Sequence, residues 1–450
     1  MPPGNQLRTA AWYGDQPLEL QFPGDWDVTV LWPHTPPPLS SDDILEALAR
    51  PAAGPPLAAL CSGKSRPLVI VDDLNRPTPV GCVMPFLLRQ LGDAGIPARD
   101  VTILMARGSH GAPRREAMLR KIGPEAAANC RFVLHDPSHD TVNVGTTSFG
   151  TPVYVNRAVL AADLVIGIGG VYPNHTAGFG GGSKLALGVL DLRVISQLHH
   201  RHDSCGWGSP ALEAAFRREL DEIAQLIALR FLVTVHVNAD RAPIRVRCGD
   251  HRVYYREEVA FAREAFCAPL PDGADVVIAN AFPNDLSLTF ALMKGDYPLR
   301  RCGADASRVL LASCSEGVGS HGVYPIVRAP WLHERRDRLR RLSLLTAREL
   351  AGKLVGRARR LLRPRRSAAP RPDDVPQASR QHRHPIWLYR TTQLSGRLPS
   401  TARGAHVVPT WAEVVTAVRQ EQGCRERIRV LVYPCAPLQI LEDRQGMGVA

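Results

Sequence analysis

The segment that most restricts the fold of this chain runs from residue 161 to residue 200, where an apolar run leads into a glycine-rich loop. The run, residues 164–168, is short, apolar and rich in β-branched side chains, which is typical of a buried strand. Glycines follow it directly, and a second glycine cluster precedes Lys184. Because glycine lacks a Cβ, such a loop brings backbone N–H groups close to an anion or a flat ligand. The segment predicts a strand that ends at a ligand site, with an ordinary surface loop as the alternative.

Two common nucleotide motifs do not fit this loop. A P-loop requires a glycine where Ser183 stands and a hydroxyl side chain where Leu185 stands. A dinucleotide fingerprint requires a third glycine at Tyr172. The loop instead carries side chains suited to covalent attachment, metal ligation and proton transfer, namely Lys184, His175, His199 and His200.

The remaining pattern predicts an α/β protein. Apolar runs at 68–71 and 101–105 flank an amphipathic helix at 83–91, and this strand, helix, strand order favours a doubly wound, mostly parallel sheet. Ser41 is expected to cap a helix before this unit. A further helix is expected to begin at Ser209 and Pro210 and to end near Ile227, before a strand at 231–237.

A linker at 268–275 precedes a second strand-forming run at 276–280, which indicates a second domain. We therefore expect an N-terminal domain over 1–270 and a smaller α/β domain over 271–450, with the active site between them. The second domain should contain strands at 386–389 and 428–433, a helix at 410–420 and a basic helical insertion at about 333–382.

Most of the net charge of +12 lies in one place. Residues 334–366 hold thirteen Lys or Arg against three acids, whereas the rest of the chain is almost neutral, so nucleic-acid binding over the whole surface is not favoured. Leucines repeat among these arginines at helical spacing. Such a helix folds back on its own domain, lies on an anionic membrane surface or binds an acidic partner. The sequence start has no signal-peptide pattern, so a cytoplasmic protein is expected.

Polar residues also follow the two earlier strands. Asp73 and Arg76 come after residues 68–71, and His110 comes after residues 101–105. The carboxyl ends of parallel strands are where open α/β sheets bind ligands, although a capped turn and a surface histidine are the simpler interpretations. Cys205 is close to the histidine pair and could act as a soft metal ligand, but a small buried thiol is the more common role.

Three of these segments together resemble the lactate racemase family. The segments are H-T-A-G-F-G-G-G-S-K at 175–184, D-L-N-R-P-T-P at 73–79 and G-S-H at 108–110. The resemblance implies a racemase or epimerase of a 2-hydroxy acid that transfers hydride to a nickel-pincer nucleotide, a pyridinium thioamide/thiocarboxylate mononucleotide. It also implies a small-molecule 2-hydroxy acid as substrate and cofactor-biosynthesis proteins acting in trans.

The resemblance assigns roles to individual residues. Lys184 would form the covalent link to the cofactor, and His200 or His199 would ligate nickel. His110 and His175 would be the two acid/base residues. Asp73, Arg76, Gly181 and Gly182 would contact the cofactor, while Arg76 and Lys294 would contact the substrate.

The chain departs from the family pattern at two places. Gly188 and Val189 replace a usual Pro-Gly pair, and Thr289 and Phe290 replace a usual Tyr-Gln pair before Lys294. The second change predicts a more apolar substrate pocket. Two alternatives therefore remain. One is an epimerase of a larger sugar acid, and the other is a repurposed homologue that binds a nucleotide or ligand, either in solution or at a membrane surface.

Overall fold

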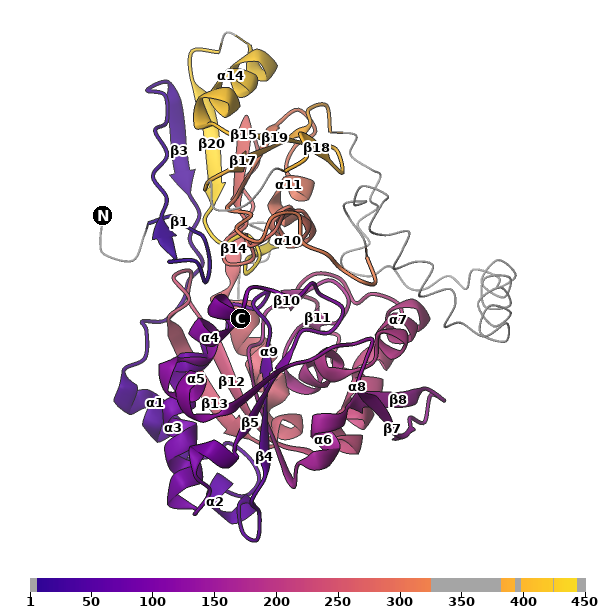
Figure 1. Ribbon diagram of the computed structural model, residues 1–450. Helices are drawn as coiled ribbons and strands as arrows, with labels where there is room; N and C mark the ends of the chain where they lie inside the picture. The colour runs from indigo at the N-terminus through magenta and orange to yellow at the C-terminus, as the bar shows by residue number, and fades with distance from the viewer. Residues whose placement is uncertain (1–5, 325–381, 393–397, 424, 443–450) are drawn as a thin grey trace.

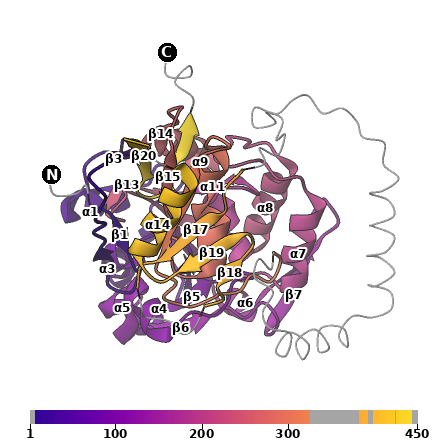
Figure 2. The same cartoon turned by 90° about the horizontal axis from the view of Figure 1, so that it is seen from above.

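The computed structural model describes residues 6–324, 382–392, 398–423 and 425–442. These residues form two large β-sheets, placed one above the other (Figure 1), and four two-stranded sheets. Seen from above, β17, β19 and α14 of the second sheet lie over the first sheet (Figure 2). The first sheet has the strand order β13-β12-β9-β4-β5-β6. Its strands are β4 (Pro67–Asp72), β5 (Thr102–Ala106), β6 (Arg131–Leu134), β9 (Leu164–Gly169), β12 (Leu229–Val237) and β13 (Pro243–Gly249). Only β12 and β13 pair in antiparallel fashion, so the predicted mostly parallel sheet is confirmed.

Helices cover both faces of this first sheet. Alternate side chains of β4 point to opposite faces, so that Val69 and Val71 belong to one core and Leu68 and Ile70 to the other. The first core is covered by α1 (Ser41–Ala49), α2 (Leu57–Leu60), α3 (Val80–Asp93), η1 (Ala98–Asp100), α4 (Arg115–Ile122), α5 (Pro124–Asn129) and α9 (His251–Ala265). The second core is covered by β7 (Thr141–Thr146), β8 (Pro152–Asn156), α6 (Arg157–Ala161), η2 (Gly182–Val189), α7 (Leu192–Arg201) and α8 (Ala215–Leu226).

The second sheet has the order β18-β19-β17-β16-β15-β20-β3 and is parallel except at β18. Its strands are β3 (Trp26–Val30), β15 (Val276–Asn280), β16 (Ser307–Ala312), β17 (Ile386–Arg390), β18 (Thr401–Ala402), β19 (Ala405–Val408) and β20 (Ile428–Tyr433). α14 (Trp411–Gln422) packs on one face, and α10 (Leu288–Phe290), the π-helical turn η3 (Ala291–Gly295) and α11 (Tyr297–Arg301) pack on the other. The strand β3 thus joins the second sheet, although it lies within the 1–270 span expected for the first domain.

Short strand pairs connect the two halves and shape their loops. They are β1 (Arg8–Thr9) with β2 (Gln16–Pro17), β10 (Pro173–Asn174) with β11 (Gly178–Phe179), and β14 (Cys267–Pro269) with β21 (Ile440–Glu442). The last pair is parallel and joins the chain just before β15 to the end of the described chain.

Two predicted helix starts are wrong. Ser40, not Ser41, caps α1, because the Ser40 hydroxyl accepts the Asp43 N–H at 3.1 Å while the Asp43 carboxylate accepts the Ser40 N–H at 2.8 Å. The helix expected from Ser209 begins only at Ala215. The residues before it pack beside the glycine loop instead, where the Gly208 N–H donates to the Gly178 carbonyl at 3.0 Å.

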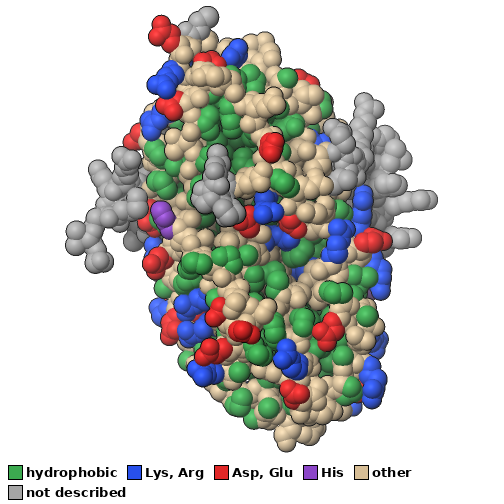
Figure 3. Space-filling model, turned by 90° about the vertical axis from the view of Figure 1, so that its left-hand side faces the viewer, with side chains coloured by type: hydrophobic (Ala, Val, Ile, Leu, Met, Phe, Trp, Pro, Cys, Tyr) green, Lys and Arg blue, Asp and Glu red, His purple; other side chains and the backbone are tan. Residues whose placement is uncertain are grey.

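Residues 334–366 lie outside the described residues, as does nearly all of the insertion expected at 333–382. On the face shown in Figure 3, Lys and Arg side chains are interspersed with Asp and Glu side chains. None of the helices described is long and apolar enough to cross a membrane.

Candidate active site

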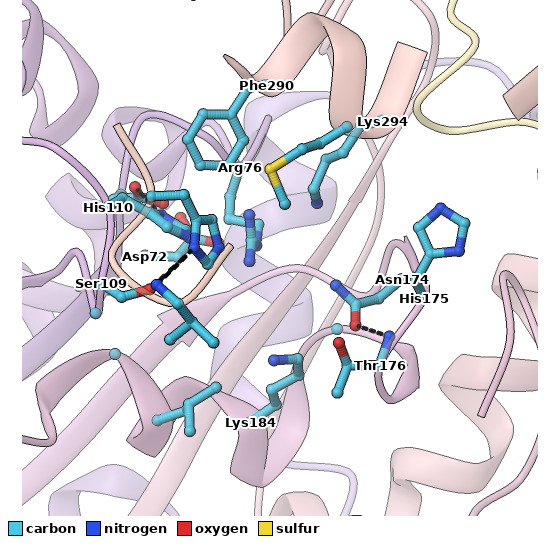
Figure 4. Close-up of a pocket in the computed structure, with 18 of the residues that line it drawn as sticks. Asp72, Arg76, Ser109, His110, Asn174, His175, Thr176, Lys184, Phe290 and Lys294 are labelled. Atoms are coloured by element: carbon cyan, nitrogen blue, oxygen red, sulfur yellow. Dashed lines mark hydrogen bonds and ion pairs between the residues drawn. The ribbon is translucent and has the colours of Figure 1, made fainter. Parts of the chain in front are cut away.

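A cavity of about 620 Å³ lies between the two sheets, at the carboxyl ends of β4, β5 and β9. The first half contributes Asp73, Arg76, His110, His175, Lys184 and His199, and the second half contributes Phe290, Lys294, Arg300, His321 and Arg403. Figure 4 shows Lys184 on one side, Phe290 and Lys294 opposite it, and Arg76 between His110 and His175. The structure therefore brings together the residues predicted for the site, with the exception of His200.

Lys184 lies in η2, and its Nζ lies 5.5 Å from the centre of the Phe216 ring. Burial, with the nearby Arg76 and Arg217 cations, lowers the pKa of Lys184 to about 7. A large fraction of the side chain is therefore the neutral amine at neutral pH, which is the nucleophilic form.

The glycines before Lys184 are required by close packing. Gly181 has a φ of +75°, and a Cβ there would lie 2.7 Å from the Gly170 carbonyl oxygen. Gly182 has a φ of +57°, and its Cβ would lie 2.8 Å from the Tyr255 ring. Both glycines line the cavity, so the loop can follow the end of β9 and still present its backbone to a ligand.

Asp73 orients His110. The His110 Nδ1 lies 2.7 Å from the Asp73 carboxylate, and the Asn75 amide donates to the same oxygen at 2.8 Å. Burial alone would raise the pKa of Asp73, but the interaction with His110 lowers it, so Asp73 remains ionised. Burial lowers the pKa of His110 despite this carboxylate. A neutral His110 therefore donates Nδ1–H to Asp73 and keeps a lone pair on Nε2, as a general base requires.

The neighbouring Asp72 forms an ion pair with a lysine that the sequence analysis missed. Lys121, on α4, is 1% exposed and forms an ion pair with Asp72 at 2.6 Å. It also donates to the backbone carbonyls of Asp73 and Arg76, at 2.6 and 3.0 Å. Lys121 thus stabilises the turn that carries Asp73, the residue to which His110 donates. Its signal in the sequence was a lysine at a core-facing helix position, beside Met118 and Ile122.

His175 is held by Arg300, another residue not predicted from the sequence. The Arg300 guanidinium donates to the His175 Nε2 at 2.8 Å, so the hydrogen of the neutral ring lies on Nδ1. Burial, followed by the charge of Arg300, lowers the pKa of His175 to about 3. His175 is therefore neutral, as is His110 on the opposite side of the cavity (Figure 4). A substrate hydroxyl would have to replace Arg300 at Nε2 to use this base.

The structure separates the two adjacent histidines of α7. His199 lines the cavity, and its Nδ1–H donates to the Ile195 carbonyl at 2.7 Å, which leaves a lone pair on Nε2. Burial and the nearby Lys184 lower the pKa of His199 to about 3, so this lone pair is available to a metal. His200 is exposed and bonds to Ser196 on the outer side of the helix. Within the described chain, no cluster of three or more His, Cys, Asp or Glu side chains could hold a metal ion.

Positive charge dominates the rest of the cavity. Arg76, Lys294, Arg300 and Arg403 line it, while Asp296 is paired with Arg300 at 3.2 Å. Lys294 is buried on η3, and burial together with Arg76 and Lys184 lowers its pKa well below the ordinary value. These cationic groups repel one another, so a bound anion would stabilise their charged forms. Phe290 and His110 pack edge to face, with ring centres 4.7 Å apart, so Phe290 adds an apolar surface on this side.

Comparisons with known proteins agree with this arrangement. Residues 13–206 match the lactate racemase N-terminal domain. The lactate racemase of Lactiplantibacillus plantarum is 26% identical over 299 residues, which cover 64% of this chain and 69% of that protein. The lactate racemase of Thermoanaerobacterium thermosaccharolyticum is 25% identical over 324 residues, which cover 66% and 71%.

The same fold occurs in solved structures. The lactate racemase apoprotein from T. thermosaccharolyticum superposes with a TM-score of 0.64 at 20% identity, over 97% of this chain and all of that one. A protein from Thermotoga maritima superposes with a TM-score of 0.59 at 15% identity, over 90% and 99%. The fold thus defines the class, an α/β protein built like lactate racemase, with two stacked sheets and a cavity between them. The chain is thus similar to lactate racemases both in sequence and in fold.

Proposed function

We propose that this protein is a racemase or epimerase of a 2-hydroxy acid that uses a nickel-pincer nucleotide bound covalently to Lys184. The observation that carries the proposal is the pair of neutral histidines, His110 and His175, placed on opposite sides of one cationic cavity (Figure 4). Racemisation needs a proton-accepting group on each face of the substrate, and a neutral imidazole with a lone pair is such a group.

The residues present fit such a cofactor. Lys184 offers a partly neutral amine for the covalent link, and His199 offers one imidazole lone pair, a suitable donor for nickel. One histidine cannot hold a metal alone, so the cofactor itself would supply the other ligands. The glycine backbone at 181–182 and the cations around Arg76 would accommodate an anionic nucleotide.

The need for a cofactor follows from the chemistry of the substrate. The carboxylate and hydroxyl of a 2-hydroxy acid stabilise a carbanion at C2 poorly, so loss of hydride to give a neutral keto acid is the easier route. No side chain accepts hydride, and the cofactor, when bound, supplies that acceptor. The chain supplies the rest: Arg76 and Lys294 bind the carboxylate, and His110 or His175 takes the hydroxyl proton and returns it.

Intact-protein mass spectrometry with metal analysis tests the proposal. The wild type, Lys184→Ala and the exposed-lysine control Lys64→Ala would each be co-expressed with a cofactor-biosynthesis pathway. We expect a covalent adduct and about one nickel per chain in the wild type and in K64A, and neither in K184A. Turnover of the loaded protein with lactate and larger 2-hydroxy acids would then identify the substrate.

The opposite result has an equally clear meaning. A wild type that gains no adduct and no nickel, under conditions that load a lactate racemase, would refute the enzyme proposal. The repurposed binding module would then be the better interpretation, with Phe290 filling space beside His110.

A further inference from the structure

A loop of the second half pairs with the loop that carries His110. Residues 313–324 follow β16 and cross to the first sheet, where the Gly322 N–H donates to the Ser109 carbonyl at 2.7 Å. The Gly111 N–H donates in turn to the Ser320 carbonyl at 3.1 Å. These two bonds form an antiparallel bridge between His110 and His321, whose ring centres are 5.1 Å apart.

The tautomer of His321 is set by its own loop. Its Nδ1 accepts the backbone N–H groups of Val323 and Tyr324, at 3.2 and 3.1 Å. Because these groups can only donate, Nδ1 carries a lone pair and the ring hydrogen lies on Nε2. Burial, with His110 and His199 nearby, lowers the pKa of His321 and keeps the ring neutral. The ring lines the cavity, and the hydrogen bonds among the described residues leave its Nε2–H unused.

The two rings therefore present opposite hydrogen-bonding groups to the cavity. His110 offers a lone pair on Nε2, since its Nδ1–H is donated to Asp73, whereas His321 offers an Nε2–H. Phe290, itself 2% exposed, packs beside both rings, with centres 4.7 Å from His110 and 6.0 Å from His321. A hydroxyl group, which donates one hydrogen bond and accepts another, matches this pair.

We propose that His321 is a further catalytic residue, which donates its Nε2–H to the C2 oxygen of the substrate while that hydroxyl donates to His110. The inference rests on the proposed function. In the reaction, the hydroxyl proton moves to the His110 Nε2, the hydride leaves C2 for the hydride-accepting cofactor, and the O–H bonding pair becomes the second bond of the C=O group. The oxygen gains negative character as its proton leaves, so the bond from His321 strengthens in the transition state. Such a donor is worth about 10²–10³ in rate.

Two substitutions separate this role from support of the loop. In His321→Asn, the side-chain oxygen can replace Nδ1 as acceptor for Val323 and Tyr324, but no donor reaches the position of Nε2. In His321→Gln, an amide N–H can reach that position. His139→Leu, at a histidine whose side chain is 80% exposed, is the matched control. Each variant would be loaded by co-expression, and the adduct on Lys184 would be checked by mass.

The expected results are specific. H321N should carry the adduct and lose about 10²–10³ in kcat/KM. The loss should be equal for both enantiomers, because the equilibrium constant of racemisation is one. In single-turnover experiments with H321N, hydride loss should be slower only from the enantiomer whose hydroxyl faces His110. H321Q should recover part of that rate. Pyruvate, the 2-oxo acid probe, should bind about tenfold more weakly to H321N, whereas H139L should match the wild type in every measurement.

Other outcomes overturn the proposal in distinguishable ways. Unchanged kcat/KM and unchanged pyruvate affinity in H321N would refute a role for His321 and leave the proposed function intact. A loaded wild type that converts no 2-hydroxy acid would refute the proposed function. In that case the pyruvate titration still decides whether His321 donates to a 2-oxo oxygen, and a wild type that also fails to bind pyruvate would refute both.

Discussion

Replacing Asp73 by Asn should slow racemisation by about 10³-fold. When His110 takes the hydroxyl proton it becomes a cation, and the Asp73 carboxylate lies 2.7 Å from its Nδ1. With both charges spread over their groups, an effective separation of about 4 Å and a dielectric constant of about 20 give about 4 kcal/mol. This energy stabilises the protonated base but not the neutral one, so its loss raises the barrier by about the same amount, or about 10³ in rate.

The assay is kcat/KM for both enantiomers as a function of pH, with the adduct on Lys184 confirmed by mass. Asp73 opposes the effect of burial on His110, so without it the pKa of His110 falls further and the acid limb of the profile moves to lower pH. Asp140→Asn, at a carboxylate 62% exposed, is the matched control and should leave both the rate and the profile unchanged. D73N within threefold of the wild type, or with an unmoved acid limb, would show that Asp73 does not act through His110.

Three other predictions follow from the site. His199→Ala should lower nickel affinity by at least about tenfold and keep the adduct, whereas His200→Ala should keep both the nickel and the adduct. Metal analysis with mass spectrometry distinguishes the two variants. Nickel loss only in H200A would reverse the assignment. Acylation of Lys184 in the unloaded protein should rise with pH to half its maximum near pH 7, because the neutral amine reacts; half-maximal labelling above pH 9 would contradict this. Gly188→Ala should lower the free energy of unfolding in urea by about 1–3 kcal/mol, because its Cβ would lie 2.6 Å from Ala106. Gly92→Ala, at a glycine with open space around it, is the control and should not destabilise the protein. Equal stabilities of the two variants would refute the packing argument.

The sheets could be predicted because their strands are buried on both faces. The runs predicted at 276–280 and 428–433 coincide with β15 and β20, and 68–71 falls within β4. Helix starts were less certain where two signals competed. Ser40 and Ser41 can both cap a helix, and only the spacing to Asp43 selects the first. Ser209 and Pro210 carry a start signal, but the segment is used to pack beside Gly178.

Helical phase also explains why the sequence alone did not decide which of His199 and His200 would ligate nickel. Adjacent helix positions differ by about 100°, and the buried residues of α7 are Val194, Ile195 and Leu198. This face includes His199 and excludes His200. Once the bounds of the helix are known, the spacing of its buried residues therefore selects His199. By contrast, Arg300 on α11 and His321 in the loop after β16 reach the site from the second half of the chain. No local pattern predicts which segments of that half will face the first sheet.

The bridge between residues 109–111 and 320–322 makes the active site a joint product of both halves. The span that matches the lactate racemase N-terminal domain, 13–206, holds His110 and His175 but not His321. The contact is also close at the backbone, because a Cβ at Gly322 would lie 3.3 Å from the Ser109 carbonyl oxygen. Chimeras that exchange halves between relatives would therefore have to take these two tripeptides from the same parent, and the two halves are constrained to diverge together.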